Sequence, residues 1–344
     1  MRILVFFLFI HCLNICFING GILSEQEALL AIKSAIKDDP HKSLSSWKNT
    51  THHCNWSFVT CSSSSHSPTV ISLDFSNLKL NGNLSPQIGF LTNLQNLSLL
   101  FNDFYGNVPS SLHLLTKLQY LNLQFNQFSG RLPLFVNMSE LRCLSLGGNH
   151  FSGSISPKFS KLQKLQVLDL SGNILSGLLP HELGLLKRLK TLDLSNNFLD
   201  EFIGDLSKLE ELHIWGNNFT GSIPHKLGTN GKLSYLNVSS NKLSGPIPES
   251  LGSCKKLYFL NLNDNQLTGQ LPVNIEKLTS ISYLSVANNN LIGKITPQIT
   301  GYNVTNFKNS SICNLVNLLI LDLSYNKFNG EVPHCLGNIS LTIS

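Results

Sequence analysis

The chain repeats one pattern of apolar and polar positions from Val70 onward. In the copy at Leu233–Pro248, LSYLNVSSNKLSGPIP, Leu236 and Val238 alternate with polar residues, and an Asn, a Gly and a Pro follow. The alternation indicates a short strand, which the Asn, Gly and Pro end before they turn the chain. One copy can bury only one edge of itself, so we expect each copy to fold only against its neighbours.

The first position of that copy returns at nearly constant intervals. Most steps are 24 residues, and the positions are Val70, Leu94, Leu118, Leu141, Leu165, Leu189, Leu209, Leu233, Leu257, Ile281 and Leu318. Such a period is typical of a leucine-rich repeat solenoid, an α/β fold with a parallel sheet on its concave face.

The ninth position of the repeat is almost always asparagine. It is Asn102, Asn126, Asn149, Asn173, Asn197, Asn217, Asn241, Asn265, Asn289 and Asn326. An Asn side chain offers both donors and an acceptor. We therefore expect stacked turns to satisfy one another's buried backbone groups through an asparagine ladder.

Two steps depart from the period. The step from Leu189 to Leu209 is 20 residues, and the step from Ile281 to Leu318 is 37. We predict about eleven repeats, irregular at 199–208 and 297–317. The predicted parts are a signal peptide at 1–21, a capping domain at 22–68, repeats at 69–340 and a tail at 341–344.

The N-terminus predicts secretion. Arg2 precedes the apolar run ILVFFLFIHCLNICFI, which ends before Gly20, as in a cleaved secretory signal. No later apolar run approaches the roughly 20 residues that a membrane-spanning helix needs, so we expect a secreted chain without a membrane span.

A helical cap should follow the signal. Ser24 and Glu27 form a capping box at the start of SEQEALLAIKSAIKDD, and we expect Asp38 to Pro40 to end the helix. In a secreted chain Cys54 and Cys61 predict a disulfide across a short loop. We expect Trp47 and Trp56 to seal the open end of the solenoid, and His52, His53 and His66 leave zinc as an alternative.

The other cysteines are less clearly assigned. Cys313 and Cys335 are 22 residues apart, close to one turn of the solenoid, and could form a second disulfide. Cys254 is expected to be buried and free. Cys143 is expected on the concave face without a partner.

One part of the predicted concave face carries aromatic and amide side chains in consecutive repeats. Such a composition is typical of binding surfaces, although a repeat of this kind always exposes some aromatic side chains. The predicted ligand-binding residues are His213, Trp215, Tyr235, Phe259, Asn261, Asn263 and Tyr283. A weaker cluster comprises Leu100, Phe101, Tyr120, Gln124 and Phe125, and the glycines Gly147, Gly148 and Gly172 separate the two.

A basic column precedes the strands, with one residue in most repeats. It could attract an acidic polysaccharide, or it could be an ordinary solvated position. Its members are Lys117, Lys164, Arg188, Lys208, Lys232 and Lys256, interrupted by Glu140. The formal net charge of +5 is too small to predict a nucleic-acid partner.

The sequence contains many N-glycosylation sequons, which fit the secretory route. They are Asn49, Asn55, Asn83, Asn96, Asn137, Asn218, Asn237, Asn303, Asn309 and Asn338. Asn237 is predicted to point from the centre of the candidate binding face.

Catalysis is not predicted. Asp169, Asp193 and His213 share one outward position beside several serines. A hydrolytic triad needs its nucleophile within about 3 Å of the base, and neighbouring strands of a flat sheet hold these groups farther apart. We predict neither an enzyme nor a cofactor or metal.

The segments named above resemble plant leucine-rich repeat receptors over residues 24–340. LSSWKNTTHHCNWSFVTC resembles their N-terminal cap, and the LxGxIPxxLGxLxxL spacing is the plant-specific subtype. GNNFTGSIPHKLGTNGKLSYLNVSSNKLSGPIPESLGSCKKL is similar to CLAVATA-type receptor kinases, which bind small secreted peptides. ICNLVNLLILDLSYNKFNGEVPHCLGN is similar to kinase-less receptor-like proteins.

The resemblance implies a recognition protein of plant signalling or defence. It would act in the cell wall or apoplast on a secreted peptide or protein, together with a co-receptor. The chain lacks a membrane helix and a kinase, so it looks like a truncated receptor. CLAVATA-type receptors place paired arginines where this chain has Asn261 and Asn263. Two alternatives are an inhibitor of a microbial cell-wall hydrolase, resembling polygalacturonase-inhibiting proteins, and a non-functional receptor fragment.

Overall fold

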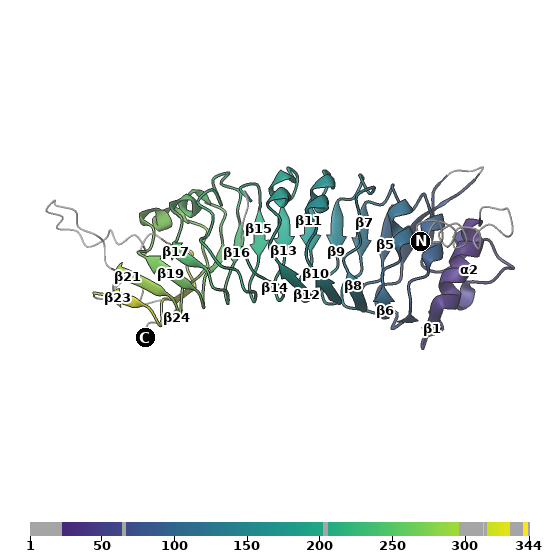
Figure 1. Ribbon diagram of the computed structural model, residues 1–344, viewed down its shortest axis with the longest axis horizontal. Helices are drawn as coiled ribbons and strands as arrows, with labels where there is room; N and C mark the ends of the chain where they lie inside the picture. The colour runs from purple at the N-terminus through teal and green to yellow at the C-terminus, as the bar shows by residue number, and fades with distance from the viewer. Residues whose placement is uncertain are drawn as a thin grey trace, which may run out of the picture.

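The repeats stack into an elongated solenoid (Figure 1). The computed structural model describes residues 23–63, 67–201, 206–295, 312, 315–330 and 340–342. Helix α2 (Glu25–Ala35) covers one end, and β23 (Lys327–Asn329) lies near the other. The predicted fold class is confirmed. The predicted signal peptide at 1–21 lies outside the described residues.

One sheet of 13 strands, the long sheet, runs the length of the solenoid. Its repeat strands pair in parallel, and β2 from the cap adds to its edge in antiparallel orientation. In order the strands are β2 (Val59–Cys61), β3 (Val70–Asp74), β5 (Asn96–Ser98), β7 (Tyr120–Asn122), β9 (Cys143–Ser145), β11 (Val167–Asp169), β13 (Thr191–Asp193), β15 (Glu211–His213), β16 (Tyr235–Asn237), β18 (Phe259–Asn261), β20 (Tyr283–Ser285), β22 (Ile320–Asp322) and β24 (Ser340–Thr342).

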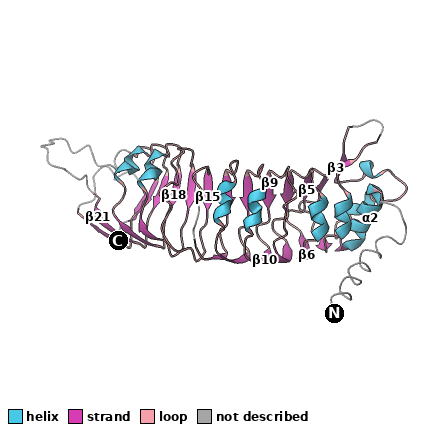
Figure 2. Cartoon of the chain, turned by 45° about the horizontal axis from the view of Figure 1, so that its top comes forward, coloured by secondary structure: helices cyan, strands magenta, loops and turns pink. Residues whose placement is uncertain are grey.

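Short strands form a second layer, which is divided in two (Figures 1 and 2). The 7-stranded part contains β1 (Ile36–Asp38), β4 (Asn81–Gly82), β6 (Asp103–Asn107), β8 (Gln127–Arg131), β10 (His150–Gly153), β12 (Ile174–Gly177) and β14 (Phe198–Leu199). The 4-stranded part contains β17 (Ser244–Pro246), β19 (Gln266–Gly269), β21 (Asn290–Lys294) and β23. Between them the described chain has the isolated bridges Glu201–Thr220 and Ser222–Ser244, at the repeat shortened to a 20-residue step.

Short 3-10 helices connect the two layers in many repeats (Figure 2). They are η3 (Pro86–Phe90), η4 (Ser110–Leu114), η5 (Pro157–Lys161), η6 (His181–Leu185), η7 (Glu249–Ser253) and η8 (Val273–Lys277), and the cap adds η1 (Ser43–Ser46) and η2 (His53–Asn55). Proline opens η3 and η5, where its missing N–H costs no helical hydrogen bond.

The asparagine ladder is confirmed. Nδ2 of Asn149 donates to the carbonyl oxygens of Leu123, Leu146 and Gly147 at 2.9, 3.0 and 3.2 Å. Its Oδ1 accepts from the backbone N–H of Phe128 at 3.0 Å. Asn149 is only 4% exposed, so these bonds replace those that water would otherwise supply.

The cap begins as predicted and ends differently. Ser24 and Glu27 form the capping box, but α2 ends at Ala35 instead of at Asp38 to Pro40. The next residues leave the helix because they pair as β1 with β4. Gly82 permits this approach, since a Cβ there would lie 2.4 Å from the carbonyl oxygen of Ala35.

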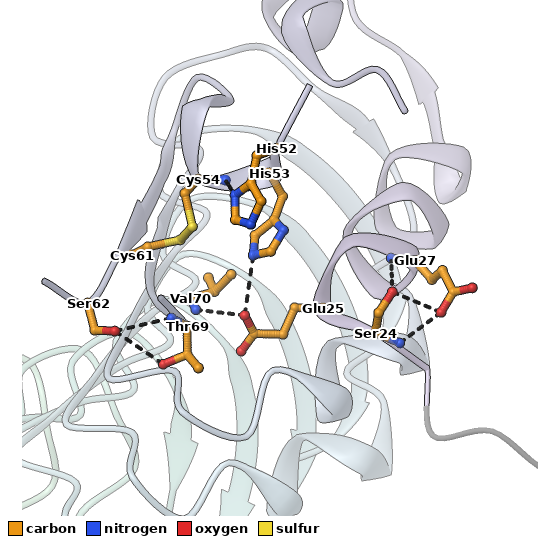
Figure 3. Close-up of polar contacts among 10 residues, drawn as sticks. All are labelled: Ser24, Glu25, Glu27, His52, His53, Cys54, Cys61, Ser62, Thr69 and Val70. Carbon is orange, nitrogen blue, oxygen red and sulfur yellow. Dashed lines mark hydrogen bonds and ion pairs between the residues drawn. A yellow bond between two sulfur atoms is a disulfide. The ribbon is translucent and has the colours of Figure 1, made fainter. Parts of the chain in front are cut away.

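The predicted disulfide between Cys54 and Cys61 is present (Figure 3). In the same cap the indole of Trp47 stacks on that of Trp56 at 5.2 Å and packs against Phe75 at 5.5 Å. Both indoles are buried and donate hydrogen bonds, Trp47 to the carbonyl oxygen of Ser57 and Trp56 to the hydroxyl of Thr51. The cap therefore covers the first repeat with buried aromatic side chains whose indole N–H groups are hydrogen-bonded.

Glu25 connects α2 to the first repeat (Figure 3). Its Oε2 accepts from the backbone N–H of Val70 at 2.9 Å and lies 3.4 Å from Nε2 of His53. His53 is buried and stacks on His52. Burial lowers the pKa of His53 and the charge of His52 lowers it further, whereas Glu25 raises it.

The pH should therefore affect the stability of the cap. The folded chain favours the neutral imidazole of His53 more than the unfolded chain does. The contribution of neutral His53 to the free energy of unfolding is therefore complete when the pH is above about 6.5, the pKa of histidine in the unfolded chain. This contribution is lost as the pH falls from there through the lower pKa of His53 in the folded chain. We expect thermal unfolding of the His53→Gln variant to depend less on pH between about 7.5 and 5 than that of the wild type. The control is His41→Gln at an exposed histidine. Equal pH dependence in wild type and His53→Gln would contradict the assignment.

The remaining cysteines divide into two groups. Cys254 is buried and free, as predicted, and donates to the carbonyl oxygen of Gly228 at 3.3 Å. Burial raises its pKa to about 11. Cys143 is free and half-buried. Cys313 and Cys335 lie outside the described residues, so their pairing stays a prediction. Among the described helices, none has the length and apolar character of a membrane span.

Candidate functional site: the outward face of the long sheet

Strand register sets the geometry of the candidate site. Tyr235 pairs with Phe259 and Phe259 with Tyr283, each in the same position of adjacent strands. On β15, β16 and β18, His213, Asn237 and Asn261 form a second column. Because parallel strands lie about 4.8 Å apart, side chains in one column must touch if they are large.

The predicted aromatic residues form one stack. The ring centroids of Tyr235 and Phe259 are 4.4 Å apart with planes 1° from parallel, and Phe259 and Tyr283 are also 4.4 Å apart. The imidazole of His213 extends the stack, 4.3 Å from Tyr235. All four rings are half-buried, so one edge of the stack faces outward. Burial raises the pKa of Tyr235.

The stack crosses from one column to another, which the sequence did not predict. His213 belongs to the column of Asn237, yet its ring packs diagonally on Tyr235. Its Nε2 lies 3.9 Å from Oε2 of Glu211. Asp193 is the register partner of His213, but its carboxylate accepts from the N–H and hydroxyl of Ser195.

The other predicted binding residues lie beside the stack. Trp215 is half-buried and makes no ring stack with the described residues. Oδ1 of Asn261 accepts from the N–H of Asn263, whose own Oδ1 accepts from Ser285 and Ala287. Their side-chain NH₂ groups donate to no described residue, so the two amides retain donors.

In the weaker predicted cluster, two aromatic rings stack on each other, which the sequence did not predict. Phe101 and Phe125 stack at 4.4 Å with planes 3° from parallel, and each is 49% exposed. Both occupy the eighth position, where φ is 53° and 52°. Bulky residues rarely adopt this left-handed region. The same position is Gly148, Gly172, Asn196, Gly216, Asp264 and Asn288 in other repeats, all with positive φ, which is the sequence signal for this conformation.

The glycine-rich middle is crossed by a hydrogen bond. Nε2 of Gln124 donates to Oδ2 of Asp169 at 2.6 Å, two repeats away. Gly147 lies between them, and a Cβ there would be 2.8 Å from Oδ1 of Asp169. Burial raises the pKa of Asp169, while the N–H and hydroxyl of Ser171 lower it. The glycines therefore let distant side chains bond across the sheet.

The described sequons divide by surface. Asn96 and Asn237 lie on the long sheet, where both are half-buried, and Oδ1 of Asn237 accepts from the hydroxyl of Ser239 at 2.8 Å. Asn218 is half-buried away from it. The exposed ones are Asn49, Asn55, Asn83 and Asn137. Asn303, Asn309 and Asn338 lie outside the described residues.

The zinc alternative loses one of its ligands. The ligand atoms of His52, His53 and Cys54 lie within 4.8 Å of one another. The sulfur of Cys54 is in the disulfide, and Nδ1 of His52 accepts from the backbone N–H of Cys54 at 3.2 Å. His66 lies outside the described residues. Zinc is not needed to explain the cap.

Three comparisons with known proteins give the family. The description "Leucine rich repeat N-terminal domain" matches residues 22–62, and "Leucine rich repeat" matches 139–199, 207–267, 117–138 and 317–339. A curated relative, the probable LRR receptor-like serine/threonine-protein kinase RPK1 of Arabidopsis thaliana, is 35% identical over 26% of this chain and 20% of its own.

Two solved structures are similar over most of the chain. The plant peptide hormone receptor RGFR1 in complex with RGF2 has 32% identity and a TM-score of 0.70, over 79% of this chain and 42% of its own. A plant ice-binding protein has 30% identity and a TM-score of 0.70, over 89% of this chain and 94% of its own. The chain thus spans less than half of the two receptors. It belongs to the leucine-rich repeat proteins and is homologous, over its repeats, to the ectodomains of plant leucine-rich repeat receptor kinases.

Proposed function

We propose that the protein is an extracellular recognition protein that binds a peptide or protein ligand on the outward face of the long sheet. The stack of His213, Tyr235, Phe259 and Tyr283 carries this proposal. Its ligand would be a secreted peptide or protein of plant signalling or defence, and a co-receptor would join the complex. Secretion to the apoplast and glycosylation of the exposed sequons belong to the same proposal.

The chemistry of this face suits an extended peptide. The ring edges supply rigid apolar area that loses little conformational entropy on binding. The NH₂ groups of Asn261 and Asn263 can donate to the carbonyl oxygens of a peptide backbone. Neither side chain is cationic, so these two positions cannot hold a carboxylate as paired arginines would.

Removing the ring of Phe259 should weaken ligand binding more than removing an exposed ring outside the proposed face. We expect Phe259→Ala to weaken ligand binding by at least about tenfold, because hot-spot aromatics typically contribute 2 kcal/mol or more. The matched control is Phe198→Ala in β14, whose ring is 56% exposed on the second layer. The ligand is first isolated by pull-down from plant and pathogen extracellular fluid, and its affinity for both variants is then measured by titration calorimetry.

The outcome of the pull-down distinguishes the alternatives. A small peptide supports recognition, and a microbial cell-wall hydrolase supports the inhibitor function. A chain that cannot be secreted in folded form supports the receptor fragment. Equal affinity of Phe259→Ala and wild type would contradict the proposed face.

Ice binding is not the function that the surface favours, despite the similarity to an ice-binding protein. A row of hydroxyls does follow the second layer, at Ser129, Ser152, Ser176, Thr220, Ser244 and Thr268. Asp200 interrupts the row, and the layer itself is divided into 7- and 4-stranded parts. A periodic solid surface would need an unbroken array.

A further inference from the structure

A basic cavity of about 360 Å³ lies beside the start of β13, β15 and β16. Its residues differ from those of the aromatic stack, because they precede the strands, whereas the stacked rings lie within them. Its lining consists of Gln166, Lys187, Arg188, Leu189, Lys190, Lys208, Glu210, Asn230 and Lys232.

The backbone aligns the cations of this cavity. The N–H of Glu210 donates to the carbonyl oxygen of Lys190, and the N–H of Ser234 donates to that of Glu210, both at 2.8 Å. Adjacent repeats are therefore in register here despite the 20-residue step. Arg188, Lys208 and Lys232 precede the first position of three consecutive repeats, and Lys256 continues the column in the next.

Among the described residues, little negative charge compensates the positive charge of the cavity. Glu210 is the acidic residue in the lining, and it lies 3.3 Å from Nζ of Lys190. The exposed side chains of Lys187, Arg188, Lys208 and Lys232 have no ion pair or hydrogen bond with the described residues. Cations at neighbouring positions of adjacent strands repel one another.

Two cations in the upstream part of the same column have side-chain partners. Nζ of Lys164 lies 2.6 Å from Oε1 of Glu140, and Nζ of Lys117 donates to Oδ1 of Asn93 at 2.6 Å. The segment from Arg188 to Lys256 thus differs from the upstream part of the column. An anionic ligand would relieve the repulsion there.

We propose that this segment binds an acidic polysaccharide, a linear chain of uronic acid sugars. The cations are repeated along the axis of the solenoid at the strand spacing of about 4.8 Å, and a uronic acid polymer repeats its carboxylates along a line in the same way. A small anion would engage one cluster and leave the rest unpaired. The side-chain amides of Gln166 and Asn230 lie in the same cavity and can bond sugar hydroxyls.

The test uses the full secreted chain and de-esterified polygalacturonate. Biolayer interferometry at low ionic strength compares the wild type with a variant that carries Arg188→Gln, Lys208→Gln and Lys232→Gln. We expect this variant to bind at least about tenfold more weakly and to depend less on salt, because fewer counterions are exchanged. The control variant carries Lys158→Gln, Lys161→Gln and Lys294→Gln, which remove the same charge from exposed sites elsewhere, and should stay within about twofold of wild type.

Three results would overturn the proposal: no binding by the wild type, an equal loss in the two triple variants, or monomeric galacturonate binding as tightly as the polymer. Unchanged thermal unfolding of the variants confirms that they are folded. Phe259→Ala should bind polygalacturonate like the wild type, so a failure of the peptide proposal and a failure of this one are distinguishable.

Discussion

Replacing Asn149 with alanine should reduce the free energy of unfolding by about 2–4 kcal/mol. The carbonyl oxygens of Leu123, Leu146 and Gly147 each keep another donor, from Asn126, Asn173 and the N–H of Phe125. The N–H of Phe128 keeps none, because Oδ1 of Asn149 is its acceptor. A buried N–H without a partner, together with the small cavity left by the amide, accounts for the loss.

Chemical denaturation with hydrogen exchange measures this effect. The control is Asn290→Ala, because Asn290 is exposed on β21 and its side chain makes no hydrogen bond with the described residues. We expect exchange to accelerate first at Phe128 and the neighbouring repeats, since each repeat contacts only its neighbours. Equal stability of Asn149→Ala and the control would show that the ladder does not stabilise the solenoid.

Removing the cap disulfide with Cys54→Ser and Cys61→Ser should cost about 2 kcal/mol. The bridge closes a loop with a sequence separation of 7, and a loop of about this length gives about 2.4 kcal/mol in the chain-entropy model. The variant should open from the cap inward, because the bridge lies in the same cap as the buried, stacked indoles of Trp47 and Trp56.

Hydrogen exchange along the chain locates this loss. Amides from Val70 to Val108 should lose protection before those of the central repeats. Cys143→Ser is the control, because it removes a free, half-buried thiol. If the first repeats remain as protected as in the wild type, the disulfide does not hold the cap.

The repeat predicted the parts of the fold that depend on local pattern. A strand recurs at the same place in each unit because Leu236 and Val238 alternate, as do their counterparts. The ladder followed from the chemistry of Asn alone. The end of α2 could not be predicted in this way, since β1 forms only because β4 lies opposite it.

The repeat period predicted which candidate site residues share a column of the sheet. It did not predict the contacts between side chains of different columns. Tyr235, Phe259 and Tyr283 stack because register alone brings them together. The packing of His213 on Tyr235 depends on side-chain rotamers, which spacing does not determine. The bond from Gln124 to Asp169 likewise depends on the absence of a side chain at Gly147.

The divided second layer should make the solenoid easier to bend at the repeat where the division lies. The long sheet is continuous through β13, β15 and β16, whereas the described residues of the opposite layer form only the isolated bridges Glu201–Thr220 and Ser222–Ser244 there. Resistance to bending depends on having hydrogen-bonded material on both sides of the neutral axis. Changes of curvature should therefore concentrate at this one repeat. Any curvature change at this point alters the angle between the stack that begins at His213 and the surface around Phe101 and Phe125.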